Sequence, residues 1–274
     1  MARMGSMPFG FPDFRGATRQ LVLANLVAYF LLAVAGLALS PAAMSYIGAH
    51  FSFVPEYFLH GWLWQPLTYS FIHPAGAVLG TLFELLSLWF LLGFLEPYRG
   101  ANWVMGLYAS AVIATAIVGA AIYQAADKVG HPMDQAPIYG CMGGIFGLLV
   151  AIGVLFGETE FMMMFIINIK AKYLAIIYAL IAFAMIFGQN KLYAFAQLGG
   201  GLGALLFIRF APRRGVGFAA SEWVYGLRNR YYRWKRRRAG RKFEVYMKKQ
   251  GRTVRLDSRG RQIEDDPNDR SRWN

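Results

Sequence analysis

Charged residues are scarce in this sequence, and the scarcity is confined to one part of it. Only 16% of the 274 residues are Asp, Glu, Lys or Arg, and 57% are hydrophobic, whereas about 25% are charged in a typical soluble domain. Residues 1–210 contain 9 Lys/Arg and 8 Asp/Glu, a net charge of +1, whereas residues 211–274 contain 19 and 7, a net charge of +12. We therefore expect an apolar membrane part followed by a basic tail.

Residues that would define a compartment or a catalytic site are also few. Cys141 is the only cysteine, so an intrachain disulfide is impossible and the redox compartment stays open. The N-terminus lacks the pattern of a cleaved signal peptide, so the first apolar run is interpreted as an uncleaved anchor. Residues 111–220 contain no serine, which removes the commonest hydroxyl nucleophile from that stretch.

Long apolar runs are what the sequence has in place of charge. A helix that spans a membrane needs about 20 mostly apolar residues. Six runs reach or approach this length: 20–39, 75–94, 103–123, 138–156, 172–187 and 192–208. The predicted fold class is an all-α membrane protein, a six-helix transmembrane bundle over residues 19–210. Residues 1–18 would form a cytoplasmic N-terminal segment, and residues 211–274 a basic cytoplasmic tail.

The distribution of aromatic and basic residues predicts how this bundle sits in the membrane. The connection at about residues 40–74 is rich in Trp, Tyr and Phe, which favours a segment lying in the headgroup region. Short loops on the side of the termini carry Arg99, Lys170 and Lys172, whereas the opposite side carries Lys128 and Lys191. Because Lys and Arg concentrate on the inner side, we predict cytoplasmic termini and a bacterial cytoplasmic membrane.

The tail begins with a pattern typical of an amphipathic helix. Trp223, Val224, Leu227, Tyr231 and Trp234 recur at helical spacing, so they would form one apolar face on the membrane surface. Anionic lipid is the expected partner of the basic residues around them: Arg228, Arg230, Arg233, Lys235, Arg236, Arg237 and Arg238. A solvated helix that acts only as a positive-inside signal is the alternative, and nucleic acid is not expected as a partner.

Four motifs in a fixed order carry a family resemblance. "WLWQPLTYSFIHP" precedes the second apolar run, "ELLSLWFLLGFLEPYRG" ends it, "GCMGGIFGLL" opens the fourth, and "AQLGGGLGALL" lies in the sixth. Together they resemble the rhomboid family of intramembrane serine proteases over about residues 20–210. The resemblance implies a six-helix bundle with a water-filled cavity, lateral access for substrate helices and, in active members, a serine–histidine dyad.

The same resemblance implies that the catalytic residues are lost. Met142 stands where active members have the nucleophilic serine, and Gln197 stands where they have the base histidine. Gly80 and Glu84 take the positions of the histidine and asparagine that stabilise the oxyanion. A thioether cannot form a hydrolysable ester, and glutamine does not accept a proton near neutral pH, so no catalytic residue is expected.

Glycines in the fourth and sixth runs predict close helix packing. Gly143 and Gly147 are one turn apart, and so are Gly199 and Gly203. Small residues allow helix backbones to approach each other in a membrane, where lipid offers no hydrophobic gain for association. We therefore expect the fourth and sixth helices to pack against each other, backbone to backbone, through these four residues.

Glu84 is the residue of this region with the clearest functional signal, because an ionisable group at membrane depth is costly and usually paired or functional. We expect its carboxyl group to share a hydrogen bond with Gln197, Tyr139 or a trapped water, with client recognition and proton transfer as alternatives. Cys141 is interpreted as a small packing residue rather than a nucleophile. His73 is interpreted as a capping or interfacial residue rather than a base.

The expected function is binding rather than catalysis. The chain is predicted to be a pseudoprotease that holds transmembrane clients without cutting them, in contact with membrane lipid. Glu84, Tyr139, Cys141, Met142 and Gln197 are the candidate cavity or client-binding residues. An active protease with a rearranged site and a small-solute permease are the alternatives. No metal ion or cofactor is expected.

Overall fold

The computed structural model describes most of residues 12–210 and a few residues beyond them. Positions 75, 132, 134, 135, 164–166 and 189 lie outside the description, and after residue 210 it covers only 228–232, 234–235, 238, 246 and 249–250. The chain divides into two units, Met1–Val216 and Gly217–Asn274, and each is treated by itself.

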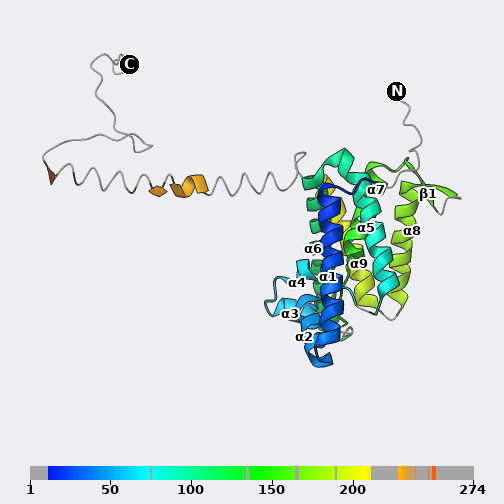
Figure 1. Ribbon diagram of the computed structural model, residues 1–274, viewed down its shortest axis with the longest axis horizontal. Helices are drawn as coiled ribbons and strands as arrows, with labels where there is room; N and C mark the ends of the chain where they lie inside the picture. Colours follow the sequence, from blue (N-terminus) through cyan, green and yellow to red (C-terminus); the bar gives the residue numbers. More distant parts are fainter. Residues whose placement is uncertain are drawn as a thin grey trace, which may run out of the picture. The chain divides into compact units, whose positions relative to one another are not determined.

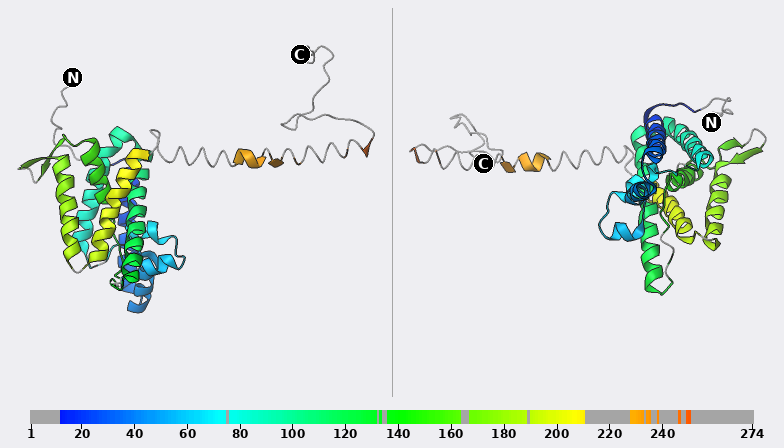
Figure 2. Two further views of the ribbon diagram at one scale, coloured as in Figure 1. Left: turned by 180° about the vertical axis from the view of Figure 1, so that it is seen from behind. Right: turned by 60° about the horizontal axis from the view of Figure 1, so that its bottom comes forward.

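The described part of the first unit is built mainly from helices (Figure 1). In chain order its elements are α1 (Gly16–Ala38), α2 (Pro41–Phe51), α3 (Pro55–Leu59), α4 (Gln65–Thr68), the 3₁₀ turn η1 (Tyr69–Phe71), α5 (Val78–Arg99), α6 (Ala101–Lys128), α7 (Met142–Leu155), β1 (Glu160–Met163), β2 (Ile167–Lys170), α8 (Ala171–Ala184), the 3₁₀ turn η2 (Met185–Phe187) and α9 (Lys191–Phe210). The two strands pair antiparallel, with Glu160 opposite Lys170. This hairpin lies at the opposite end of the bundle from α2, α3 and α4 (Figures 1 and 2).

Four of these helices are long and apolar enough to cross a membrane, namely α1, α5, α6 and α9. Two further apolar helices, α7 and the stretch Ala171–Phe187, are shorter. All six predicted apolar runs are therefore helical, but helix length alone supports four spans rather than six. The predicted bounds shift by a few residues; the second run, predicted at 75–94, is α5 at Val78–Arg99 and continues through Pro97.

The glycines of α7 pack against α6, which the sequence analysis did not predict. A Cβ atom placed on Gly143 would strike the side chain of Thr115, and one placed on Gly147 would strike Cβ of Ala111. Such contacts leave no room for a side chain, so the two helices touch at the level of their backbones. This face of α7 therefore packs against α6, and Gly147 also meets α9 as predicted, since a Cβ there would lie 3.0 Å from the carbonyl oxygen of Gly200.

The glycines of α9 also face α6, and this corrects the predicted pairing. A Cβ on Gly199 would lie 2.6 Å from Cβ of Val118, and one on Gly203 would lie 2.7 Å from the carbonyl oxygen of Ser110. The prediction that these two residues pack against α7 is wrong, because they point away from it by about a quarter turn. Gly200 makes the close approach to α7 instead, since a Cβ there would meet the backbone of Gly143.

The connection between α1 and α5 is a folded layer rather than an irregular loop. Gln65 is fully buried in it: its Oε1 accepts from the amide of Val54 at 3.2 Å, and its Nε2 donates to the carbonyl of Ala49 at 3.0 Å. Phe53 forms an isolated β-bridge with Ile138. This layer therefore holds the segment that leads into α7, and that segment carries the candidate site.

The tail belongs to the second unit, and only part of its predicted lipid-binding set is described. Arg233, Arg236 and Arg237 lie outside the described residues, as do Trp223, Val224 and Leu227. The described members of the set, Arg228, Arg230, Lys235 and Arg238, are helical. The guanidinium carbon of Arg238 lies 5.3 Å from the centre of the Trp234 ring. The helical part of the prediction holds for these residues, and lipid binding stays a prediction.

Candidate functional site

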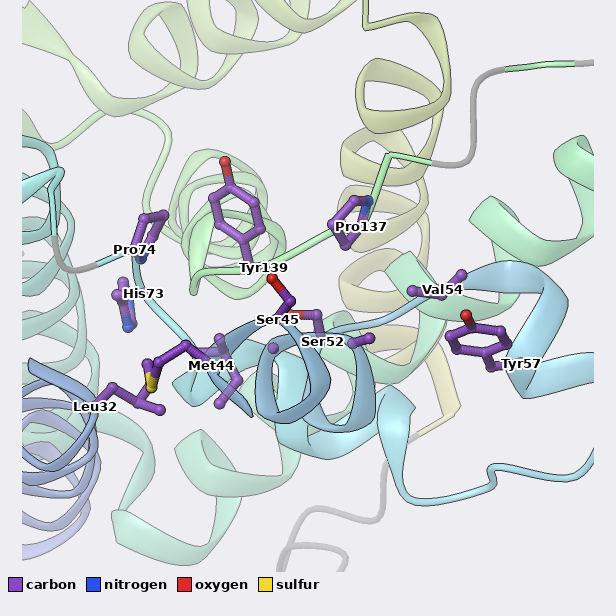
Figure 3. A pocket seen from close by; sticks show the side chains of 13 residues that line it. Leu32, Met44, Ser45, Ser52, Val54, Tyr57, His73, Pro74, Pro137 and Tyr139 are labelled. Atoms are coloured by element: carbon purple, nitrogen blue, oxygen red, sulfur yellow. The ribbon is translucent and has the colours of Figure 1, made fainter. Parts of the chain in front are cut away.

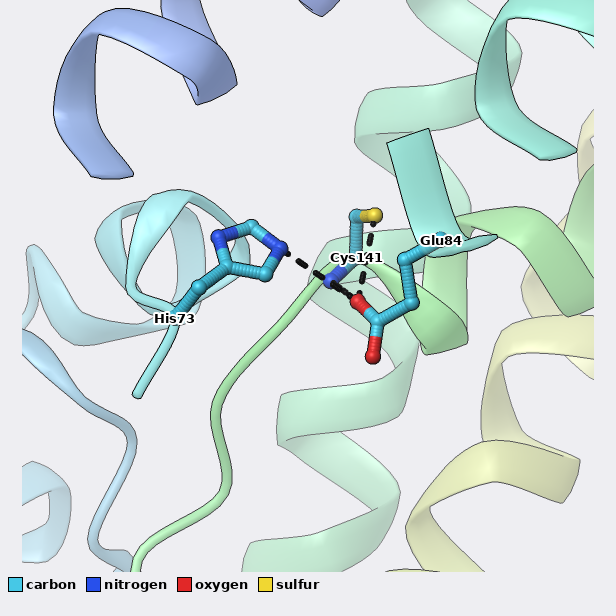
Figure 4. A group of neighbouring side chains, drawn as sticks. All are labelled: His73, Glu84 and Cys141. Atoms are coloured by element: carbon cyan, nitrogen blue, oxygen red, sulfur yellow. Dashed lines mark hydrogen bonds and ion pairs between the residues drawn. The ribbon is translucent and has the colours of Figure 1, made fainter. Parts of the chain in front are cut away.

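Three polar side chains from distant parts of the chain meet at the start of α7. His73 follows the turn η1, Glu84 lies in the second turn of α5, and Cys141 is the residue immediately before α7. Their ligand-type atoms all lie within 4.8 Å of one another (Figure 4). The residues are separated by 11 and 57 positions in the sequence, so only the tertiary structure brings them together.

One carboxylate oxygen of Glu84 is the centre of this cluster. Oε2 accepts a hydrogen bond from the backbone amide of Cys141 at 3.1 Å and another from the Cys141 thiol at 3.4 Å. Figure 4 shows the second oxygen of the carboxylate pointing away from both partners. The side chain of Glu84 is 23% exposed. The carboxyl group of Glu84 is thus hydrogen-bonded to the protein through one oxygen and stays partly accessible.

A glycine places the backbone amide that binds Glu84. Gly140 has φ = 86°, in the left-handed region that side chains disfavour. A Cβ atom at this position would also lie 2.8 Å from Oε2 of Glu84. The Gly140 amide donates to the carbonyl groups of Tyr69 and Ile72 at 3.1 and 2.9 Å. The turn before α7 is therefore anchored on η1 and directs the next amide, that of Cys141, at the carboxylate.

His73 is buried rather than interfacial, and its ring points at Glu84. Its side chain is 1% exposed, and Nε2 lies 3.3 Å from Oε2 of Glu84. The two atoms are at ion-pair distance, but they are not aligned as a hydrogen bond, and Nε2 has no hydrogen-bond partner among the described residues. On the other side of the ring, Nδ1 lies 3.4 Å from the carbonyl oxygen of Phe71. The expected capping or interfacial role is replaced by a place inside the cluster.

The remaining predicted site residues surround the cluster without joining it directly. Gln197 is buried on α9, where its side chain interacts with Tyr193 one turn earlier. Met142, the first residue of α7, packs against the hydrophobic core. Gly80 is exposed, and a Cβ there would meet nothing within 4 Å. Glu84 was expected to pair with Gln197 or Tyr139. The residues next to its carboxylate are Cys141 and His73 instead.

A cavity of about 490 Å³ adjoins the cluster. Residues of α1, α2 and α3 line it together with the segments around His73 and Tyr139 (Figure 3). Tyr139 is 43% exposed, and Figure 3 shows its ring between Pro74 and Pro137. Tyr139 was named as a candidate cavity or client-binding residue, and that role stays a prediction. His73 is thus the member of the cluster that lines this cavity.

The chemistry of the cluster does not match a hydrolase dyad. In the described residues, the Cys141 thiol donates its hydrogen bond to Glu84, and no hydrogen bond joins it to His73. An activated nucleophile needs a base within hydrogen-bond reach that is itself oriented by a third group. Here the carboxylate stands between the thiol and the imidazole. The arrangement offers three convergent donors for a cation, a possibility that neither Glu84 nor Cys141 suggests alone.

Sequence reasoning missed Tyr193 and assigned His73 to the wrong surroundings. Tyr193 lies close enough to interact electrostatically with Glu84 and Cys141, and its position four residues before Gln197 was the available signal. His73 was considered, but as a surface residue. The ring lies next to Glu84 only because the α2–α4 layer folds back onto the bundle. No local sequence pattern predicts this folding.

Comparison with known protein families assigns the chain to one of them. It belongs to the family described as eukaryotic integral membrane protein (DUF1751), whose model matches residues 19–224. No curated protein matches the chain. The prediction of a multi-pass integral membrane protein is confirmed by this match and by the four candidate spans.

Two predictions are overturned by the same match. The assignment to the rhomboid proteases is wrong, since the matching family is a different one. Two of the four motifs behind it, GCMGGIFGLL and AQLGGGLGALL, are glycine-rich and apolar, and close helix packing in a membrane selects such sequences in unrelated families. The bacterial cytoplasmic membrane is also wrong, because the family is eukaryotic. Charge asymmetry between loops reports orientation and carries no information about the organism.

Proposed function

We propose that this member of a eukaryotic integral membrane family spans the membrane six times and binds a transmembrane helix of another protein without cleaving it. The observation that supports the proposal is a row of residues on α5 that begins with exposed Gly80, continues through half-buried Glu84 and Ser87, and ends at buried Leu91. We call Gly80, Glu84, Ser87 and Leu91 the α5 stripe.

The six-span topology is supported by how the two short helices are placed. At about 1.5 Å per residue, the 14 residues of α7 are about 21 Å long, less than the roughly 30 Å of a hydrocarbon core. The backbone before α7 runs through the interior, where Cys141 is fully buried and Gly140 is hydrogen-bonded to the turn η1. Irregular backbone is tolerated at membrane depth only where protein covers it. A short helix preceded by such a segment can still complete a span.

The α5 stripe has the spacing of a helix-packing seam. Its members follow one another at intervals of four, three and four residues, which keeps them on one side of the helix. Gly80 and Ser87 are the small residues that let a second helix approach, and Ser87 and Glu84 can exchange hydrogen bonds with it. The open space around Gly80 shows that none of the described residues fills this part of the seam.

An apolar hollow continues the stripe toward the hairpin. It has a volume of about 130 Å³ and is lined by Phe90 and Leu91 of α5, Leu149 and Ile152 of α7, Phe161, Ile169, Ala171 and Leu174. The helices α5 and α8 thus flank it while α7 forms its floor. Residues of α8 beyond it, such as Ile177 and Leu180, are exposed. A helix lying between α5 and α8 would cover the stripe and the hollow together.

The partner we propose carries a hydrogen-bond donor within its span. Because one oxygen of Glu84 is directed away from its protein partners, a donor on the incoming helix would satisfy it. Within the cluster, the Cys141 thiol donates to Glu84 rather than to His73, and this arrangement supports binding without cleavage. The test uses two synthetic single-span peptides, one with an Asn at the depth of Glu84 and one with Leu there.

Binding is measured by energy transfer between labelled peptide and protein in proteoliposomes, and the same samples are examined for peptide fragments. We expect the Asn peptide to bind more tightly, and Gly80→Leu to weaken its binding about tenfold, which corresponds to about 1.4 kcal/mol. Gly36→Leu is the matched control, since Gly36 is an exposed glycine on α1 with only an ordinary contact to Met44. Equal binding by both variants, or any peptide cleavage, would refute the proposal.

A further inference from the structure

We propose that His73, Glu84 and Cys141 bind one divalent transition-metal ion, with zinc as the best match to the donor set. The proposal concerns this cluster alone and does not depend on the binding of a transmembrane helix. It goes against the expectation, drawn from the sequence, that the protein has no metal site. It rests on the separations between the three donor atoms, the state of the His73 ring and the charge of the ligand set.

Two of the three separations between the donor atoms are those of a tetrahedral site, and the third, between Nε2 of His73 and Sγ of Cys141, lies within 4.8 Å. Zinc binds His nitrogen at about 2.0–2.1 Å, carboxylate oxygen at about 2.0–2.2 Å and Cys sulfur at about 2.3 Å. Ligands at these distances in tetrahedral directions are separated from each other by about 3.3–3.6 Å. The observed distances from Oε2 of Glu84 are 3.3 Å to Nε2 of His73 and 3.4 Å to Sγ of Cys141. A metal ion fits between them with only small movements of the side chains.

The His73 ring is oriented as a metal ligand would be. Its Nδ1 faces the carbonyl oxygen of Phe71 at 3.4 Å, and a ring N–H held by a backbone carbonyl leaves the lone pair of the other nitrogen free. That other nitrogen, Nε2, is buried, points into the cluster and has no hydrogen-bond partner among the described residues. A buried polar atom without a partner costs free energy. A metal ion at this place would remove that cost.

The charge of the ligand set suits a site inside a membrane protein. A thiolate and a carboxylate together carry two negative charges, so a divalent ion bound to them and to a neutral imidazole forms a neutral group. Burying a neutral group is far less costly than burying an unpaired carboxylate. Binding therefore releases the thiol proton of Cys141 to solvent, and the sulfur lone pair forms the bond to the metal.

Sulfur, nitrogen and oxygen donors in one tetrahedral set favour zinc over magnesium or calcium, which prefer oxygen donors alone. Three protein ligands leave a fourth position for water or another donor. The metal would also connect the segment after η1, the first half of α5 and the start of α7. Near the start of α5, Glu84 already forms two hydrogen bonds with the residue that precedes α7.

The experiment uses the full chain, purified in detergent and freed of metal with a chelator. Co²⁺ is titrated as a spectroscopic substitute for Zn²⁺, because a tetrahedral cobalt–thiolate site absorbs in the visible region and shows a sulfur-to-metal charge-transfer band. We expect one Co²⁺ per chain and its displacement by Zn²⁺. Cys141→Ser should abolish the charge-transfer band, and His73→Gln should weaken binding at least about 100-fold, more than the loss of an outer partner costs.

His60→Gln is the matched control, since His60 is exposed and its ring is bonded to the carbonyl of Glu56. It should leave the affinity and the spectrum unchanged. X-ray absorption at the zinc edge of the wild-type protein provides a test that does not depend on any variant folding, and it should show one sulfur in the first shell. A wild-type spectrum without sulfur coordination, or equal affinity in the His73 and His60 variants, would overturn the proposal.

Discussion

Replacing Gly200 by alanine tests the claim that α7 and α9 meet backbone to backbone. A Cβ atom at this position would collide with the carbonyl oxygen of Gly143, and it would lie 2.7 Å from Oγ1 of Thr115 and 3.1 Å from the carbonyl carbon of Gly143. The nearest atom belongs to the backbone of Gly143, so rotation of the Thr115 side chain alone cannot relieve the clash. The helices must move apart instead.

The cost follows from two opposing effects. Overpacking a close-packed core by a methyl group costs about 1–3 kcal/mol, whereas alanine is favoured over glycine inside a helix by up to about 1 kcal/mol. We therefore expect Gly200→Ala to lower the free energy of unfolding by about 1–2 kcal/mol. In a membrane domain of this size that corresponds to a melting temperature lower by about 2–8 °C.

The assay is thermal unfolding in detergent, followed by tryptophan fluorescence. Gly80→Ala is the matched control, because Gly80 is also a helical glycine but has open space where the methyl group would go. It should leave the melting temperature unchanged or raise it. If Gly200→Ala melted at or above the wild-type temperature, the close approach of α7 and α9 would be refuted.

Two further predictions concern the end of the bundle that carries the hairpin. Glu96 accepts hydrogen bonds from the amides of Ala17 and Thr18 at the start of α1, both at 2.9 Å. Glu96→Ala should therefore lower the free energy of unfolding by about 1–2 kcal/mol, and Glu96→Gln should lower it by less. An unchanged unfolding curve for Glu96→Ala would contradict the capping role. Hydrogen bonds from Lys170 and Lys172 lower the pKa of Glu158 from its ordinary 4.5 to about 2. Since the folded pKa is the lower one, these pairs stabilise the hairpin above pH 4.5 and stop doing so as the pH falls toward 2. Amide exchange in the hairpin should quicken over that window in the wild type but not in Glu158→Gln.

Much of the fold could be predicted because each apolar run carries its own signal. All six predicted runs are helices, and α1, α5, α6 and α9 have the length and hydropathy of membrane spans. The short helices α7 and α8 could not be assigned as spans in the same way, because their ends depend on the chain around them. The folded layer of α2, α3 and α4 was also missed, since its stability comes from buried contacts such as those of Gln65 rather than from periodicity.

The candidate site, like the fold, could be predicted only in part from the sequence. Glu84 could be singled out from the sequence, because it is a charged residue within an apolar helix. Its partners could not, since the amide of Cys141 and the ring of His73 reach it only through the turn at Gly140 and the return of the α2–α4 layer. The resemblance to a protease family directed attention to Gln197 instead, which pairs with Tyr193 on its own helix.

By itself the sequence determined that this is a helical membrane protein with a basic tail, because hydrophobicity and charge act locally along the chain. It also determined that the glycines of α7 and α9 lie at close helix contacts, since few other roles explain glycine at helical spacing in a membrane. The tertiary structure alone decided which helix each glycine meets: Gly199 and Gly203 meet α6, whereas Gly200 meets α7. It likewise decided what Glu84 binds, because a buried carboxylate takes whichever donors the folded chain brings within reach.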